Sequence, residues 1–291
     1  MPFLARNIGQ EVASASKSVT ARDVLAYAAG IGEASDRYLD DARAGGIYAV
    51  PFYNVSLEWQ LVVANRQSPD TGLTPEEVRS NVHAKQDTVF HRPIRPGDHT
   101  LTRGRWVEAR TVNAGSLSVM ELTTTREPSG EPLATTWSTG IYRGTALDGD
   151  PVSLGGPPPL PINPASAFPD GATEVDVFIP RHMPHSYSEC ADIWNPVHTE
   201  REVALAAGLP DIILHGTATW ALAGKEILHA YVDGDGAALK RFCGRFVGMV
   251  IPGTTITIRH VRDPEVAGVV RYEVLTQDGA RAIDQGVAVL G

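Results

Sequence analysis

The sequence has little cysteine, which excludes one class of protein at once. Only Cys190 and Cys243 occur among 291 residues, too few for the disulfide framework that stabilises small secreted domains. Long apolar runs are also missing, since no stretch approaches the roughly 18 residues that a membrane span requires. Residues 1–6 contain no apolar core of signal-peptide length. We therefore expect a soluble cytoplasmic protein that does not enter a membrane.

Positive charge is scarce as well. The 25 Lys and Arg residues are outnumbered by 34 Asp and Glu, which gives a formal net charge of -9 and a pI near 5.5. A chain with this negative net charge is not expected to bind nucleic acid or an anionic membrane surface as its main partner. Hydrophobic residues, by contrast, make up 43% of the chain. This composition is typical of a folded protein with a sizeable core, and the length allows two domains.

Two distant stretches of the chain share one design. Residues 94–97 and 250–253 each end in a Pro-Gly turn that precedes alternating apolar and polar residues. The prolines, Pro96 and Pro252, lie 156 residues apart. Similar offsets, of 149 and 160 residues, separate Gly130 from Gly279 and Tyr27 from Tyr187. These offsets predict a diverged duplication with repeated units of about 150 residues.

A segment rich in glycine and proline separates the two repeats. Residues 144–172 include three consecutive prolines, which cannot donate backbone hydrogen bonds to a sheet. We therefore expect an N-terminal domain over 1–145, a linker over 146–173 and a C-terminal domain over 174–291. The alternative interpretation of the segment is a Pro-rich recognition motif.

Each half is expected to combine a helix with several long strands. Helical spacing of apolar residues predicts a helix over 22–29, which Thr20 could cap, and a longer helix over 211–231. Alternating apolar and polar residues predict strands over 99–110, 115–125, 133–142, 242–262 and 269–277. The pattern therefore indicates an α+β fold with long antiparallel strands.

Acid–base side chains gather in the segment Asp192-Ile-Trp-Asn195-Pro196-Val-His198. Asn195 before Pro196 suits a helix start, because asparagine caps backbone N–H groups and proline loses nothing at the first position. Thr199 and Glu202 have the spacing of a capping box for a helix that continues to residue 207. Helix capping alone would explain Asn195, Thr199 and Glu202.

His198 is the strongest candidate for proton transfer in this segment. It lies in the first turn of the expected helix, whose positive end disfavours the imidazolium form, and a neutral imidazole can accept or donate a proton. Eighteen residues later, Gly216 begins the apolar helix, where a ligand carbonyl could approach its N–H closely. The alternatives are a structural histidine and a glycine that is required only for packing.

Asn195-Pro-x-His198, followed by His215-Gly216, resembles the active-site segment of MaoC-like dehydratases and (R)-specific enoyl-CoA hydratases. The resemblance implies a double hot-dog fold, in which two units each wrap an antiparallel sheet around a long helix and the sheets join side by side. It also implies addition of water to a 2-enoyl thioester, or its removal from a 3-hydroxyacyl thioester, on CoA or a carrier protein. In the family an aspartate and the histidine share the proton work, the asparagine helps to hold the water, and the glycine N–H holds the enolate oxygen.

The aspartate of that pattern is missing here. It stands five residues before the histidine, and Ile193 occupies this position. Asp192 stands one residue earlier, and adjacent side chains of an extended loop point in opposite directions, so Asp192 can replace it only in a rearranged loop. Alternatively, His198 works with another acid such as Glu189. A third possibility is a non-catalytic acyl-thioester-binding protein or partner subunit, and a hot-dog thioesterase is a further option.

The resemblance also implies the cofactors, partners and remaining site residues. It requires no metal or redox cofactor, since CoA or phosphopantetheine is part of the substrate. Tyr27 to Gly32 carries no acid–base group, which resembles fused family members whose first unit only shapes the acyl tunnel. Hot-dog sheets usually pair edge to edge, and the two halves could satisfy that need within one chain. We expect a homodimer in addition.

Three further residues are candidates for substrate binding. Arg241 and Arg245 are candidates for contact with CoA phosphates or are solvated strand residues. His215 is expected to orient loops and is a further candidate for substrate binding. The His182 to His185 spacing could bind a metal, but we expect a surface turn there and no metal site.

Overall fold

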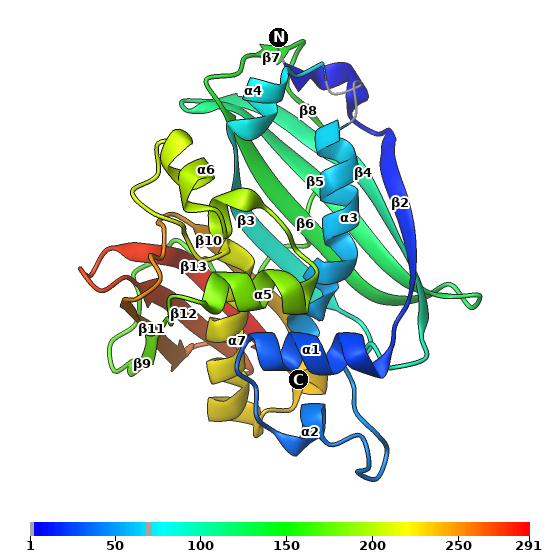
Figure 1. Ribbon diagram of the computed structural model, residues 1–291, viewed down its shortest axis with the longest axis vertical. Helices are drawn as coiled ribbons and strands as arrows, with labels where there is room; N and C mark the ends of the chain where they lie inside the picture. The colour runs from blue at the N-terminus through cyan, green and yellow to red at the C-terminus, as the bar shows by residue number, and fades with distance from the viewer. Residues whose placement is uncertain (1–2, 68–71) are drawn as a thin grey trace. The chain divides into compact units, whose positions relative to one another are not determined.

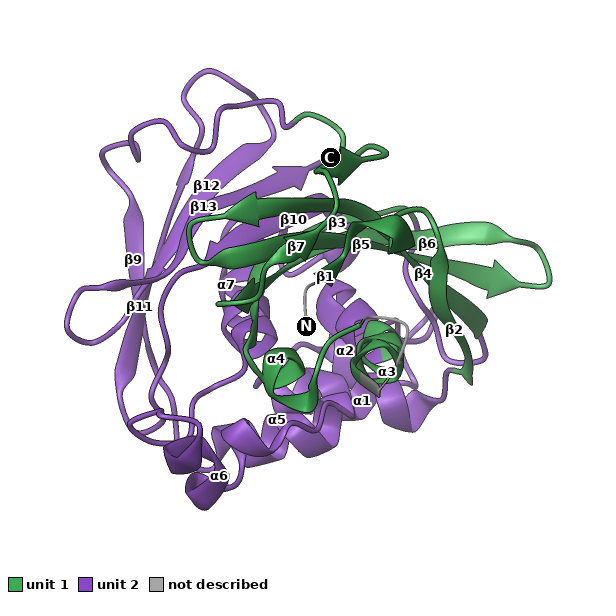
Figure 2. Cartoon of the chain, turned by 90° about the horizontal axis from the view of Figure 1, so that it is seen from above, with its two compact units in different colours: residues 1–18, 57–91, 99–159 green, residues 19–56, 92–98, 160–291 purple. Residues whose placement is uncertain are grey.

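The computed structural model describes residues 3–67 and 72–291, which fall into two compact units (Figure 2). Unit 1 takes residues 1–18, 57–91 and 99–159, and unit 2 takes 19–56, 92–98 and 160–291. The domains expected from the sequence follow the repeat along the chain. The compact units divide the chain differently, because residues 19–56 of the first half belong to unit 2.

Unit 1 contains an antiparallel sheet with the strand order β2–β4–β5–β6–β3. Its three central strands confirm the strands expected over 99–110, 115–125 and 133–142. The bounds are β2 (Glu11–Ser18), β3 (Asn81–Phe90), β4 (His99–Val112), β5 (Gly115–Glu127) and β6 (Glu131–Arg143). Shorter elements are β1 (Phe3–Leu4), η1 (Ala5–Asn7), α4 (Pro75–Arg79), β7 (Leu147–Asp148) and β8 (Val152–Ser153).

Helix α3 (Asn54–Gln67) was not expected from the sequence. Leu61 packs into a core with Trp106 and Leu122, and Glu58 accepts a hydrogen bond from Gln86 at 3.3 Å. Three polar residues of the helix, Asn54, Glu58 and Asn65, are each at most 4% exposed. A buried face that mixes polar with apolar side chains lacks the apolar period from which a helix is recognised in a sequence.

Unit 2 repeats the topology of unit 1. Its strand order is β10–β13–β12–β11–β9, so in each unit the first two long strands along the chain stand at opposite ends of the strand order. Gly97 and Gly253, with φ of 92° and 90°, form the same turn before β4 and β11. The structure therefore confirms the duplication. The strands are β9 (Thr173–Phe178), β10 (Leu239–Phe246), β11 (Thr255–Arg262), β12 (Val269–Leu275) and β13 (Arg281–Leu290).

The long helix of unit 2 is α7 (Gly216–Val232), which packs against β10 to β13 (Figure 1). Its fully buried Trp220 contacts the ring of Phe242 at 4.9 Å, and Phe242 stacks on Tyr272 at 4.7 Å. Helices α3 and α7 occupy the same place in the order, between the first and second strands of their units. The chain is thus an α+β double hot-dog. Among the described residues, no helix has the length and apolarity needed to cross a membrane.

Helix α1 (Ala21–Gly30) pairs with helix α5 (Met183–Ala191), and both belong to unit 2. The expected cap is confirmed, because Thr20 and Asp23 form a capping box. The rings of Tyr27 and Tyr187, which are related by the repeat, lie 6.0 Å apart. The helix expected as the core helix of the first half is therefore the counterpart of α5, and α3 is the counterpart of α7.

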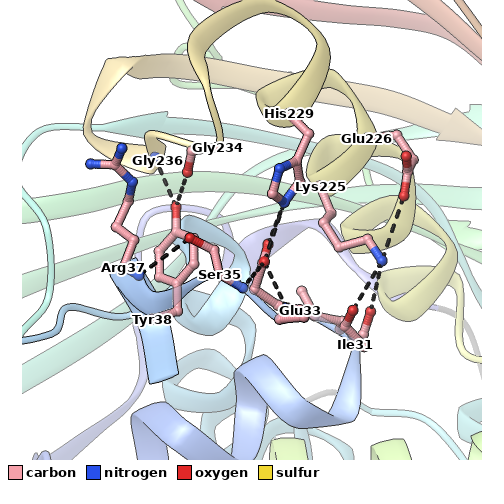
Figure 3. A network of polar contacts seen from close by, with 12 residues as sticks. Ile31, Glu33, Ser35, Arg37, Tyr38, Lys225, Glu226, His229, Gly234 and Gly236 are labelled. Carbon is pink, nitrogen blue, oxygen red and sulfur yellow. Dashed lines mark hydrogen bonds and ion pairs between the residues drawn. The ribbon is translucent and has the colours of Figure 1, made fainter. Parts of the chain in front are cut away.

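A polar network ties the segment after α1 to the C-terminal half of α7 (Figure 3). Buried Glu33 accepts a hydrogen bond from His229 at 2.9 Å, and the Tyr38 hydroxyl donates to the Gly234 carbonyl at 2.7 Å. Lys225 reaches the carbonyls that end α1. These contacts between side chains distant in sequence explain why residues 19–56 belong to unit 2. Remaining elements there are α2 (Asp36–Leu39), η2 (Pro51–Tyr53) and η5 (Gly236–Ala238).

The close approach of α1 and α5 yields a stability prediction. A Cβ at Gly30 would lie 2.6 Å from the Cβ of Cys190, so Gly30→Ala overpacks the crossing. We expect the free energy of unfolding in urea to fall by about 1–3 kcal/mol. In the double variant Gly30→Ala/Cys190→Gly the opposing Cβ is gone. We therefore expect Gly30→Ala to lower the free energy of unfolding less in the Cys190→Gly background than in wild type. A single variant as stable as wild type contradicts the packing.

Candidate active site

Helix α5 ends in a left-handed residue that sets the path of the site segment. Asp192 has a φ of 55°, and the N–H groups of Asp192 and Ile193 both donate to the Ser188 carbonyl. Beyond this turn the Ile193 side chain is buried at 3% exposure, whereas Asp192 is exposed. An apolar side chain therefore fills the position at which the family pattern has its carboxylate.

The expected helix caps in this segment are wrong. Asn195 precedes the short 3-10 helix η4 (Pro196–His198), but its side chain makes no capping bond. Helix α6 (Arg201–Ala206) begins after Glu200, again without a side-chain cap, so Thr199 and Glu202 form no capping box. The backbone satisfies the turn instead, because His198 N–H donates to the Asn195 carbonyl at 3.0 Å. Capping thus does not account for the amide at 195.

His198 is the last residue of η4, so the expected effect of a positive helix end on it is wrong. The structure fixes the ring by another route. Its Nδ1 lies 2.8 Å from the carbonyl oxygen of Ile213. Because a carbonyl only accepts hydrogen bonds, Nδ1 carries the proton in this contact. In the neutral ring Nε2 is then the nitrogen with the lone pair, which is what a general base requires.

The ring of His215 stacks on that of His198, with centroids 3.7 Å apart and an angle of 28° between the planes. His215 is only 2% exposed, and its Nε2 lies 3.2 Å from the Ser188 hydroxyl. Burial, helped by the positive charge that His198 can carry, lowers the pKa of His215 to about 2. His215 is therefore a neutral side chain that connects α5 to the start of α7, as expected of an orienting residue.

Gly216 is the first residue of α7, and its N–H lies at the positive end of a long helix. The first hydrogen bond inside this end runs from Ala218 N–H to the His215 carbonyl at 3.0 Å, two residues beyond Gly216. A Cβ at 216 would approach the Phe246 ring to 3.2 Å. A side chain at this position would therefore crowd Phe246. Since Gly216 follows His215 directly, the stacked ring brings the helix start close to His198.

Three tyrosines, one each from α1, η2 and α5, lie beside this arrangement. The Tyr187 ring contacts His215 at 4.9 Å, and its hydroxyl donates to Thr217 at 3.2 Å. Burial raises the pKa of Tyr187 to about 12, so its hydroxyl stays protonated. Tyr53, beside Tyr27, has a pKa raised by burial and by the charges of Asp23 and Asp192. The carboxylate at 192 thus lies close enough to act on the interior of this unit.

The remaining candidates from the sequence lie as follows. Arg245 is exposed and forms an ion pair with Asp284 at 2.6 Å, while Arg241 is buried at 7% exposure on the same strand. His182 lies in an exposed turn before α5, as expected, whereas His185 is exposed in the first turn of the helix itself. Among the described residues no cluster of three or more His, Cys, Asp or Glu could hold a metal.

Sequence reasoning missed two parts of the site. The Ile213 carbonyl that orients His198 is a backbone group, which no residue type can signal. Ser188 lies four residues before Asp192, and its bond to His215 joins residues 27 positions apart, a distance at which no local pattern applies. Both contacts join residues 188–198 to the segment that leads into α7.

Comparison with known proteins agrees with this geometry. Residues 187–277 match the MaoC like domain, and residues 6–136 match the FAS1-like dehydratase domain region. An enoyl-CoA hydratase of Mycobacterium tuberculosis is 28% identical over 267 residues, 88% of this chain and 88% of that protein. The structure of a MaoC-like dehydratase from Phytophthora capsici has a TM-score of 0.79 and 25% identity, covering 97% of this chain and 95% of that one. A double hot-dog protein of M. tuberculosis, 14% identical with a TM-score of 0.62 over 95% of this chain and 93% of that one, supports the fold.

Burial of neutral His215 predicts a pH dependence of stability. The folded state holds its pKa near 2, whereas the unfolded chain protonates this residue near about 6.5, so the unfolded state binds more protons at acid pH. Stability is therefore lost as the pH falls below about 6.5. Between about pH 7.5 and about pH 5, we expect wild type to lose about 2 kcal/mol more unfolding free energy in urea than His215→Gln. Parallel pH profiles for the two proteins would contradict this.

Proposed function

The chain belongs to the MaoC-like dehydratase family, and from this we propose that it is a hydro-lyase acting on acyl thioesters. It adds water across the double bond of a 2-enoyl thioester or removes water from a 3-hydroxyacyl thioester. The observation that supports this proposal is the pairing of an imidazole oriented by a backbone carbonyl with a nearby helix start. His198 presents Nε2, and Gly216 opens α7 beside the stacked His215.

The chemistry follows from these groups. In hydration, Nε2 of His198 takes a proton from water while the water oxygen attacks C3 of the enoyl group. Electron density moves to the thioester oxygen, where the Gly216 N–H and the helix end stabilise the enolate. A proton delivered to C2 then restores the thioester carbonyl. The Asn195 amide, which is not used as a cap, helps to hold the water.

The second proton-transfer group is proposed to be Asp192. Its left-handed conformation departs from the extended loop in which neighbouring side chains point in opposite directions, so the chain is rearranged at this residue. Glu189, also exposed and one turn earlier on α5, is the alternative acid. The buried Ile193 favours the rival function, a non-catalytic protein that binds acyl thioesters.

We further propose CoA or a carrier protein as the carrier of the acyl group, with no cofactor besides that carrier. Buried Arg241 and exposed Arg245 are the proposed contacts for its phosphates, and Arg245 would have to leave Asp284 to make one. A cytoplasmic location and a homodimer complete the proposal. Size-exclusion chromatography with light scattering measures the oligomeric state.

Turnover tests the two central residues. With crotonyl-CoA, loss of the conjugated-enoyl absorbance follows hydration, and we expect His198→Ala and Asn195→Ala to lower kcat about 10²–10⁴-fold. The free energy of unfolding should change little for Asn195→Ala, because its side chain caps no helix. His182→Ala, an exposed histidine at the start of α5, is the matched control and should keep wild-type turnover.

Three results would contradict the proposal or one of its residues. A wild-type rate in His198→Ala or in Asn195→Ala excludes that residue from the mechanism. No turnover by wild type on several acyl lengths, together with measurable binding of the CoA esters, supports the binding protein. Release of free thiol in place of hydration identifies a thioesterase.

Asp192→Asn tests the carboxylate separately. We expect a clear but smaller loss of kcat than for His198→Ala, about 10-fold to 100-fold, because His198 and the Gly216 N–H remain. Glu189→Gln is the matched comparison on the same helix. An unimpaired Asp192→Asn enzyme together with an impaired Glu189→Gln enzyme would assign the proton transfer to Glu189.

A further inference from the structure

The rings of His198 and His215 are in contact, so a positive charge gained by His198 lies against the ring of His215. When His198 takes a proton from water it becomes an imidazolium, and a neighbouring carboxylate would normally stabilise that cation. Position 193, from which the family pattern supplies one, holds a buried isoleucine. The neighbour that the structure places against the ring is His215, with centroids 3.7 Å apart.

His215 has the properties required of a neutral aromatic support. Its burial and its low pKa keep it uncharged at any pH at which the enzyme works, so it does not compete for the proton. Its own position is fixed, because Ser188 binds Nε2 at 3.2 Å and the Tyr187 ring lies 4.9 Å away. A cation over the face of an aromatic ring is attracted by the π electrons, and more strongly where water is excluded.

We propose that the face of His215 stabilises the imidazolium of His198 during turnover. His215 is thus a positioning residue, which acts through His198. The inference rests on the proposed function of His198 as the base, and it assigns to the stacked ring a part in proton transfer that is separate from that of any carboxylate.

Other charged groups also surround His198. Helices α5 and α6 pack against η4, and Asp211 pairs with Arg201 of α6 at 3.2 Å. These groups are left unchanged in the test, so their contributions cancel between variants. The titratable residues on these elements are His185, Tyr187, Glu189, Cys190 and Asp192 at α5, Arg201 and Glu202 in α6, and Asp211.

The test compares His215→Phe with His215→Leu. Phenylalanine keeps a flat aromatic face, whereas leucine keeps apolar bulk without one. We expect the acid limb of the kcat/KM profile to move to lower pH by about half a pH unit in His215→Leu, with kcat reduced about 3-fold to 10-fold. In His215→Phe the limb should stay near its wild-type position. Ser188→Ala, which removes the hydrogen bond but leaves the ring, is the control for orientation.

A purely structural role of His215 predicts a different pattern. In that case His215→Phe and His215→Leu lower kcat to the same extent, and the acid limbs of their kcat/KM profiles lie at the same pH. That result overturns the proposal. Titration of the His198 ring by NMR in each folded variant gives the same comparison without turnover. If wild type hydrates no enoyl thioester, the proposed function fails, whereas the difference in His198 titration between Leu and Phe variants still tests the stacking.

Discussion

The hydrogen bond from His198 Nδ1 to the Ile213 carbonyl is the contact on which the rest of the site depends. It leaves Nε2 as the basic nitrogen and holds the ring against His215. His215 in turn immediately precedes Gly216, so the stack places the candidate base beside the start of α7. The bond at Nδ1 also defines which nitrogen of the ring can accept a proton.

The duplication explains why one half carries the site and the other does not. Gly32 and Asp192 are related by the repeat offset of 160 residues, and both are left-handed, with φ of 64° and 55°. In the first half, the next residue is Glu33, bonded to His229, and the counterpart of His198 is Tyr38, fully buried and bonded to Gly234 and Gly236. The carboxylate is thus present in the half without the imidazole, where it serves as a structural anchor.

Burial decides which polar groups act and which only support. His215 is neutral because it lies in the interior, and Glu33 is held by backbone N–H groups and His229. Asp192, by contrast, is exposed beside the segment that carries His198. The proposed site therefore combines a neutral, buried support with an exposed acid.

The sequence by itself determined the repeat, strands β4, β5, β6 and β12, the capped helix α1 and the motif residues, because turn signals, alternation and spacing are local properties. The single strand expected over 242–262 is wrong, because the structure has β10 and β11 there, separated by residues 247–254. The sequence did not reveal α3, whose buried face includes Asn54, Glu58 and Asn65, nor the transfer of residues 19–56 to unit 2. Only the tertiary structure decided the tautomer of His198, the stack on His215 and the missing caps. Each of these depends on contacts between segments far apart in the chain, and such contacts leave no local pattern in the sequence.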